Sequence, residues 1–309
     1  MNVAWMAQSA SQGNHLEHNK MKILLTGGSG DLGKVLTSRL AKRGDTVLRF
    51  DIRNPTDKGG DFISGSVLDR HKLQEILPGV DCIVHIAAWH GYHEFTKKKN
   101  IYDFWDVNVT GTFNIFQAAL EANINKIIYI SSEAVADKEG NYGWTKVLGE
   151  EIAERYVQNH QFNVLTLRPR AFIPYWNKEV YQSFVEWCAW FWKGAVHIND
   201  VAQAVTQGID LLSQKPLPQH LILPVDGAYQ YTQEDLHNWD HSGAGTTFKK
   251  YYANYVDLAI QYGLSPASKP TIQDISETKR WLGYEPSYSM LSMLEDLSKY
   301  GESGPPVAL

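Results

Sequence analysis

Three side chains in this sequence have the types and spacing that proton transfer requires. Tyr142 and Lys146 form a YxxxK pattern in GNYGWTKVLGEEIAERY, and a four-residue spacing places both side chains on one face of a helix. An adjacent ammonium group stabilises a phenolate and lowers the pKa of the phenol from about 10. Ser132 directly follows the apolar run KIIYIS and can donate a hydrogen bond to the same substrate oxygen. YxxxK alone also fits an exposed helical pair, so this prediction depends on the neighbouring motifs.

A glycine-rich turn provides a candidate phosphate site. TGGSGDLG (residues 26–33) lies between an apolar run and a helical pattern, with glycines at GxxGxxG spacing. Glycine lets the backbone approach a pyrophosphate closely, and free amides and the helix dipole stabilise its charge. A surface turn is the alternative, but the flanking elements favour dinucleotide binding. We assign to the cofactor Gly27, Ser29, Gly30, Asp31, Leu32 and Gly33.

Asp51 ends the next apolar run, TVLRFD. A carboxylate there can accept hydrogen bonds from both hydroxyls of an adenosine ribose, whereas a 2′-phosphate would be repelled. NAD is therefore favoured over NADP, although Arg53 would partly compensate the charge in an NADP-using protein. A solvated aspartate at a strand end is the alternative.

Apolar runs alternate with helix-length segments along most of the chain. The predicted strands are KILLT (22–26), TVLRF (46–50), CIVHIA (82–87), KIIYIS (126–131) and NVLTLR (163–168), with LILPV (221–225) as a further candidate. Strands separated by helices predict an α/β fold with a doubly wound parallel sheet of the Rossmann type. This fold places the motifs above at the carboxyl edge of the sheet.

The alternation stops after Arg168, where an aromatic stretch has a loop-like pattern until a helix is predicted at 199–212. We expect a Rossmann domain at 21–170, to which 195–225 returns, and a small inserted substrate-binding subdomain at 171–194 and 226–300. Residues 1–20 are polar and aperiodic, which predicts a disordered extension. The Gly/Pro-rich residues 301–309 predict a flexible tail.

The ordered motifs resemble those of the extended short-chain dehydrogenase/reductases, the NAD-dependent epimerase/dehydratase family, from about Met21 to Leu297. The matching segments are LLTGGSGDLG, Asp51, VHIAA (84–88), NVTGT (108–112), YISSEAV (129–135), YGWTK (142–146), LRP (167–169), VHINDVAQA (196–204) and DISETKRWLGYEP (274–286). The resemblance implies that the catalytic residues are Ser132, Tyr142 and Lys146. It also implies that Lys146 holds the nicotinamide ribose.

The same resemblance implies further roles. Ala87 and Ala88 would line the cofactor, Asn108 would brace the neighbouring helix, and Pro169 would lie beside the nicotinamide. Two positions depart from the family pattern. Ser66, followed by Val67, stands where an acidic residue near the adenine is usual, and Ala136 replaces the usual tyrosine after SSxxV. Relatives often pair through two long helices, here near 102–122 and 142–159, which implies a homodimer.

The substrate is expected to be small. In relatives that act on nucleotide sugars, the stretch after LRP is long because it builds a lid over the nucleotide, whereas here it spans only residues 169–196. This resembles the uronate-dehydrogenase type and favours a free sugar, sugar acid or polyol. We expect Trp89 and His90 to contact the substrate together with Ser132, and Arg170 to bind an anionic group. Packing of the 89–94 loop against the aromatic subdomain is the alternative.

Composition and spacing argue against other classes. With 29 Lys+Arg and 34 Asp+Glu, the net charge of −5 gives no basic surface for nucleic acid. The densest apolar stretch, 185–196, contains two charged residues and is too short to cross a membrane. Two distant cysteines predict reduced thiols and a cytoplasmic protein. His90, His93 and Glu94 lack HExxH spacing and a further ligand, so no metal is expected.

The sequence thus predicts an NAD-dependent oxidoreductase that transfers hydride between NAD and a hydroxyl or carbonyl of a small sugar-like or sugar-acid substrate. Tyr142 would exchange the proton. A nucleotide-sugar epimerase or dehydratase is the alternative within the family, and Glu133 would be the extra acid/base of a dehydratase. A non-catalytic NAD-sensing regulator is the alternative from another class, but it would not need all three catalytic residues.

Overall fold

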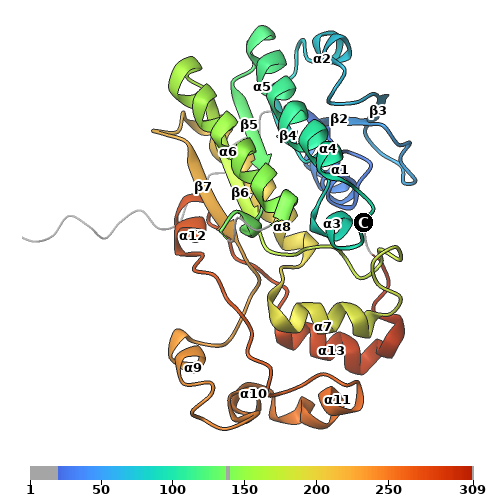
Figure 1. Ribbon diagram of the computed structural model, residues 1–309, viewed down its shortest axis with the longest axis vertical. Coiled ribbons are helices and arrows are strands. Elements are labelled where there is room, and N and C mark those ends of the chain that lie inside the picture. Colours follow the sequence, from blue (N-terminus) through green and yellow to red (C-terminus); the bar gives the residue numbers. More distant parts are fainter. Residues whose placement is uncertain (1–19, 137–139, 308–309) are drawn as a thin grey trace, which may run out of the picture.

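A parallel sheet of seven strands, in the order β3-β2-β1-β4-β5-β6-β7, forms the centre of the computed structural model (Figure 1). The structure describes residues 20–136 and 140–307, so the predicted extension at 1–20 lies outside the described residues apart from Lys20. The strands are β1 (Lys22–Thr26), β2 (Thr46–Asp51), β3 (Asp61–Ser64), β4 (Cys82–His85), β5 (Lys126–Ile130), β6 (Asn163–Pro169) and β7 (Leu221–Val225). The predicted doubly wound Rossmann-type sheet is confirmed.

Burial explains which strands the sequence pattern detects. All four residues of β4, and all but the first residue of β1 and β5, are buried, and strands covered on both faces read as continuous apolar runs. The sequence pattern misses β3, because this edge strand exposes Asp61 and Ser64.

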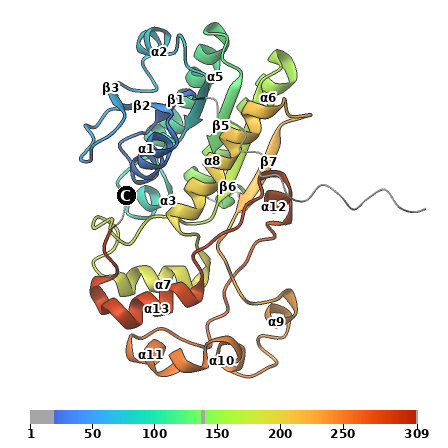
Figure 2. The same ribbon diagram turned by 180° about the vertical axis from the view of Figure 1, so that it is seen from behind.

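Helices cover both faces of the sheet. On one face lie α1 (Asp31–Arg43) and α8 (Ile198–Gln214), as Figure 2 shows, and their apolar residues share a core cluster with β1 and β6. On the other face lie α2 (Arg70–Ile76), α5 (Gly111–Glu121) and α6 (Gly140–His160). The packing of α6 on β5 is tight, because a Cβ at Gly149 would overlap the hydroxyl oxygen of buried Tyr129.

Short elements connect the carboxyl ends of the strands to these helices. They are α3 (Gly91–Phe95), α4 (Ile101–Phe104), the π-helical segment η1 (Trp105–Thr110) and the 3-10 turn η2 (Glu133–Val135). The first three lie in the β4–α5 connection, and η2 follows β5 directly. The connections therefore bring the predicted catalytic and cofactor residues to one edge of the sheet.

A second, aromatic core lies below that edge in Figure 1. It is built from α7 (Phe184–Gly194), α9 (Gln233–His237), α10 (Thr246–Tyr252), η3 (Ala253–Tyr255), α11 (Val256–Gln261) and α13 (Met290–Tyr300). In contrast, α12 (Ser276–Leu282) packs against α8 and β7. This part of the segment predicted to form the subdomain therefore joins the sheet layer.

Two sequence expectations change in this region. The aromatic stretch expected to be loop-like contains α7, which is amphipathic: Trp187 and Trp192 are buried, whereas Trp190 is exposed. The end of the chain, expected as a flexible tail, is packed over 301–307. There η4 (Gly301–Ser303) follows α13, and the Tyr175 hydroxyl donates a hydrogen bond to the Pro305 carbonyl at 2.9 Å. Among the described residues, no helix is both long and apolar enough to span a membrane.

Candidate functional site

The glycine-rich turn between β1 and α1 makes a close backbone approach to the end of β4. Gly27 has a φ of +69°, and a Cβ there would lie 2.9 Å from the Ala87 amide nitrogen. A Cβ at Gly33 would lie 2.5 Å from the Gly28 carbonyl oxygen. Since β2 and β4 flank β1 on opposite sides, the turn lies where the strand order reverses, which is the dinucleotide position of such sheets. The glycine-rich turn at residues 26–33 therefore forms a glycine cradle that fits a pyrophosphate.

Asp51, at the end of β2, is buried and faces this turn. Its Oδ2 atom accepts a hydrogen bond from the Ser29 amide at 3.0 Å, and its Oδ1 atom accepts one from the Arg53 amide at 3.0 Å. A carboxylate has about four acceptor positions, so it retains capacity for ribose hydroxyls. The Arg53 side chain is 68% exposed.

Ser66 and Val67 follow β3 at the same edge. The Val67 carbonyl accepts a hydrogen bond from Asn114 Nδ2 at 3.0 Å, and the Val67 side chain packs against Gly111 at the start of α5. Ala87 and Ala88 follow β4 and are half-buried. Leu32 is a core residue of α1, whereas the Asp31 carboxylate accepts a hydrogen bond from Asn177 Nδ2 at 2.7 Å.

The three candidate proton-transfer residues come together after β5. Lys146 is 3% exposed, and its Nζ donates a hydrogen bond to the Ile130 carbonyl at 2.7 Å. The same Nζ lies 6.0 Å from the centre of the Tyr142 ring. Ser132 is buried at the start of η2, and its side chain interacts with the Tyr142 phenol. The arrangement can hold a substrate oxygen between a hydroxyl donor and a phenol.

Burial dominates the electrostatics of this group. It raises the pKa of Tyr142 to about 12, opposed by the interaction with Ser132. Burial also lowers the pKa of Lys146 to about 7, opposed by the Glu150 carboxylate. The polypeptide by itself therefore shifts the pKa of the phenol upward, in the direction opposite to the one expected from the adjacent lysine.

Buried Glu150 is a site residue that the motif search missed. It accepts hydrogen bonds from Ser131 Oγ at 2.5 Å and from Arg168 Nε at 2.8 Å, beside the lysine whose charge it favours. Its position four residues after Lys146 on α6 is a signal that could have identified it.

Asn108 ties the β4–α5 connection to α6. Its Oδ1 accepts a hydrogen bond from the Trp89 amide at 2.8 Å, and its Nδ2 donates to Thr145 Oγ1 at 3.0 Å. Thr145 in turn donates to the Tyr142 carbonyl at 2.9 Å. Asn108 thus contacts the helix that the resemblance implies it braces.

The loop with the expected substrate residues forms α3. His90 precedes this helix, and burial lowers the pKa of its imidazole to about 3, so the ring is neutral. The rings of His90 and His93 lie 4.1 Å apart, and the Lys99 ammonium lies over Trp89. The Glu94 carboxylate accepts hydrogen bonds from two amides of α6. Among the described residues, no group of three His, Cys, Asp or Glu side chains could hold a metal.

Arg170 is not placed as expected for an anion-binding residue. It is 7% exposed, and its guanidinium donates hydrogen bonds to the carbonyl and the hydroxyl of Thr271, both at 2.5 Å. It also lies 3.1 Å from Glu133 Oε2 and 3.8 Å from Asp226 Oδ2. The guanidinium is held by groups of the protein because segments distant in the sequence converge on it. Pro169, one residue earlier, pairs with Val225 at the edge of β6 and β7.

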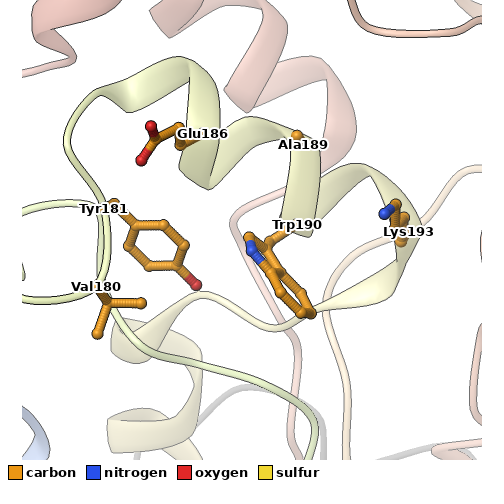
Figure 3. A pocket seen from close by; sticks show the side chains of 6 residues that line it. All are labelled: Val180, Tyr181, Glu186, Ala189, Trp190 and Lys193. Atoms are coloured by element: carbon orange, nitrogen blue, oxygen red, sulfur yellow. The ribbon is translucent and has the colours of Figure 1, made fainter. Parts of the chain in front are cut away.

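The segment between β6 and α7 crosses the edge of the sheet. Asn177 holds it to α1 through Asp31, and the Tyr92 hydroxyl of α3 donates to the Glu179 carbonyl at 2.6 Å. Beyond it is a hollow of about 250 Å³. Figure 3 shows Tyr181 and Trp190 facing each other there; the lining residues are Val180, Tyr181, Glu186, Ala189, Trp190 and Lys193.

The shifted pKa of Lys146 predicts how stability depends on pH. The folded chain releases this proton near pH 7 and the unfolded chain near 10.5, so the unfolded state binds more protons between these values. The free energy of unfolding of the wild type, relative to that of Lys146→Met, should therefore rise as the pH increases from about 7 to 10. Urea unfolding of both proteins between pH 7 and about 10 measures this difference in the free energy of unfolding. A difference that falls or stays constant would contradict the shift.

Comparisons with known proteins identify the family of this chain. The model of the NAD dependent epimerase/dehydratase family matches residues 23–184. The uncharacterized protein y4nG of Sinorhizobium fredii is 28% identical over 316 residues, covering 88% of this chain and 76% of that protein. Uronate dehydrogenase of Pseudomonas putida is 24% identical over 206 residues, covering 61% and 71%. The match to two other relatives spans only 30% and 65% of their lengths.

Among solved structures, UDP-glucuronic acid 4-epimerase from Bacillus cereus, in complex with UDP-glucuronic acid and NAD, has a TM-score of 0.66. It is 20% identical, covers 91% of this chain and 98% of its own, and shares the fold. The family model covers more than half of the chain, including the glycine-rich turn and the residues gathered after β5. The chain therefore belongs to the NAD-dependent epimerase/dehydratase family.

Proposed function

We propose that this NAD-dependent enzyme is an oxidoreductase that transfers hydride between NAD and a hydroxyl or carbonyl of a small sugar-like or sugar-acid substrate. The observation that carries the proposal is the meeting of Ser132, Tyr142 and Lys146 at the sheet edge that also bears the glycine cradle. The cradle, with Asp51 facing it, fits a dinucleotide. Gly27, Ser29, Gly30, Gly33 and Asp51 would hold it, and bound NAD supplies a hydride acceptor.

In the oxidative direction, Tyr142 takes the proton of the substrate hydroxyl, and the carbon that carries this hydroxyl loses a hydride, for which bound NAD would be the acceptor. Ser132 donates a hydrogen bond to the substrate oxygen and orients it. Lys146, fixed on the Ile130 carbonyl, would hold the nicotinamide ribose. In the reductive direction the proton returns from the Tyr142 hydroxyl to the carbonyl oxygen.

The pKa of Tyr142 indicates whether reduction or oxidation is easier for this residue to catalyse. A phenol with a pKa of about 12 is protonated at neutral pH, so it serves as the acid of a reduction directly. Oxidation requires added positive charge near the phenol to favour its deprotonation. The positively charged nicotinamide ring of oxidised NAD and the Lys146 ammonium together would provide that charge.

The short stretch between β6 and α8 supports a small substrate, because it leaves little chain to build a lid over a nucleotide. The similarity to uronate dehydrogenase of Pseudomonas putida supports the same substrate class.

A nucleotide-sugar epimerase or dehydratase is the alternative within the family. The fold shared with a UDP-glucuronic acid 4-epimerase favours it, as does Glu133 next to Ser132. However, Glu133 is bound by Arg170 and by Gln273 Nε2, which donates to it at 2.9 Å. An NAD-sensing regulator without turnover is the alternative from another class.

A panel of free sugars, sugar acids and nucleotide sugars, mixed with protein and NAD, separates these functions. Growth of the reduced-nicotinamide absorbance band with a free sugar or sugar acid supports the proposal. Conversion of a nucleotide sugar without net reduction, detected by chromatography, indicates an epimerase or dehydratase. NAD binding without any conversion indicates a regulator.

Replacing the proposed acid/base tests its role. Tyr142→Phe should lower kcat by about 10²–10⁴-fold, the usual contribution of general acid–base catalysis, while the affinity for NAD stays unchanged. Steady-state kinetics and calorimetric titration with NAD measure the two effects. Tyr102→Phe, at an exposed tyrosine of α4, is the matched control and should retain full activity. A large loss of NAD affinity in Tyr142→Phe would contradict this division of roles.

Asp51 is proposed to select NAD over NADP. Asp51→Ala should lower the ratio of kcat/KM for NAD to that for NADP about tenfold or more, because a charged hydrogen-bond acceptor contributes roughly 1.5–3 kcal/mol. The ratio is the right measure, since the substitution also leaves the Ser29 amide without its carboxylate. An unchanged ratio would show that Asp51 serves only the turn.

A homodimer is proposed through the outer faces of η1, α5 and α6. There a hollow of about 420 Å³ is lined mainly by apolar side chains such as Trp105, Phe113 and Ile152, and Phe113 is 42% exposed. Removing a carboxylate from water in such a mainly apolar interface is costly, so Phe113→Glu should halve the mass measured by light scattering. Ile260→Glu, on exposed α11, should leave it unchanged. Wild-type protein with the mass of one chain would refute the dimer.

A further inference from the structure

Glu94 reaches from α3 to the first turn of α6. Its Oε1 accepts a hydrogen bond from the Asn141 amide at 2.6 Å, and its Oε2 accepts one from the Tyr142 amide at 3.0 Å. Gly140 makes room for this contact: it has a φ of +74°, and a Cβ there would lie 2.8 Å from Glu94 Oε2. Both carboxylate oxygens are thus committed to the backbone that carries the proposed acid/base.

These two amides need an external partner. The first four N–H groups of a helix have no acceptor within it, and a carboxylate at this end also complements the helix dipole. Asn141 and Tyr142 are the second and third residues of α6. Glu94 comes from a segment almost fifty residues earlier, so it couples the start of α6 to the β4–α5 connection.

The element that carries Glu94 is itself held firmly on the site. A Cβ at Gly91 would lie 3.4 Å from Cδ1 of the Tyr142 ring, so α3 packs directly against that ring. Asn108 binds the Trp89 backbone just before α3, and Tyr92 binds the Glu179 carbonyl. Glu94 therefore acts from a fixed support on the backbone of Tyr142.

We propose that Glu94 is a positioning residue that sets the place of the Tyr142 phenol relative to Ser132 by fixing the first turn of α6. The proposal rests on the proposed function of Tyr142 as acid/base. A displacement of about 1 Å in a reacting group can lower the rate about 10²-fold, whereas the cofactor cradle, built on β1 and β2, does not involve this contact.

Kinetics of Glu94→Ala and Glu94→Gln test the role. We expect kcat to fall about tenfold to 10²-fold in Glu94→Ala, with KM for NAD unchanged. Glu94→Gln, which has the same shape, keeps one oxygen acceptor but faces the other backbone N–H with an NH2 donor, so it should recover part of the activity. Ser289→Ala is the matched control, since it removes the N-cap of α13 at a similar cost in stability and should leave kcat unchanged. If Glu94→Ala affects kcat no more than this control, or if Glu94→Gln recovers nothing, the proposal is overturned.

Hydrogen exchange tests the same contact without turnover. Amide exchange at Asn141 and Tyr142 should be faster in Glu94→Ala than in the wild type, and Ser289→Ala should not change it. Unchanged exchange at these amides overturns the proposal even if kcat falls. If the wild type converts no compound in the panel, the proposed function fails, whereas faster exchange with a displaced Tyr142 ring signal in NMR spectra would still support positioning by Glu94.

Discussion

The hydrogen bond from the Lys146 ammonium to the Ile130 carbonyl is the interaction on which the site depends. An almost fully buried ammonium is costly, and the lowered pKa of Lys146 expresses that cost. The bond requires α6 to lie directly on the end of β5. A glycine at 149 permits this approach, because any side chain there would meet Tyr129. The positions of Lys146 and of the Tyr142 phenol therefore both depend on the close packing of α6 on β5.

Local signals predicted the parts of the site that depend on neighbouring residues in the sequence. The glycine-rich turn, Asp51 and the YxxxK spacing are encoded within short stretches, because backbone approach and helical periodicity need only local residue types. The strands buried on both faces were predicted for the same reason. Edge strand β3 was missed, since its exposed residues remove the apolar run.

Interactions between distant segments could not be predicted in the same way. Arg170 follows β6 and was expected to bind a substrate anion, but Thr271, Glu133 and Asp226 converge on it from three other segments. The burial that accompanies this cluster raises the pKa of Asp226 to about 6. The contact of Glu94 with the start of α6 is similar, because nothing in the sequence near residue 94 indicates which helix it caps. Likewise, the sequence pattern of α7 is interpreted as a loop, because the buried face of this helix is defined only by the distant segments of the aromatic core.

The segment between β6 and α7 is held above the sheet edge by Asn177 on Asp31 and by Tyr92 on the Glu179 carbonyl. Tyr175 and Tyr181 of the same segment are buried in the aromatic core. The segment therefore ties that core to α1, which follows the cofactor turn, and to α3 of the β4–α5 connection, so the aromatic core and the cofactor edge of the sheet are joined through a single stretch of chain.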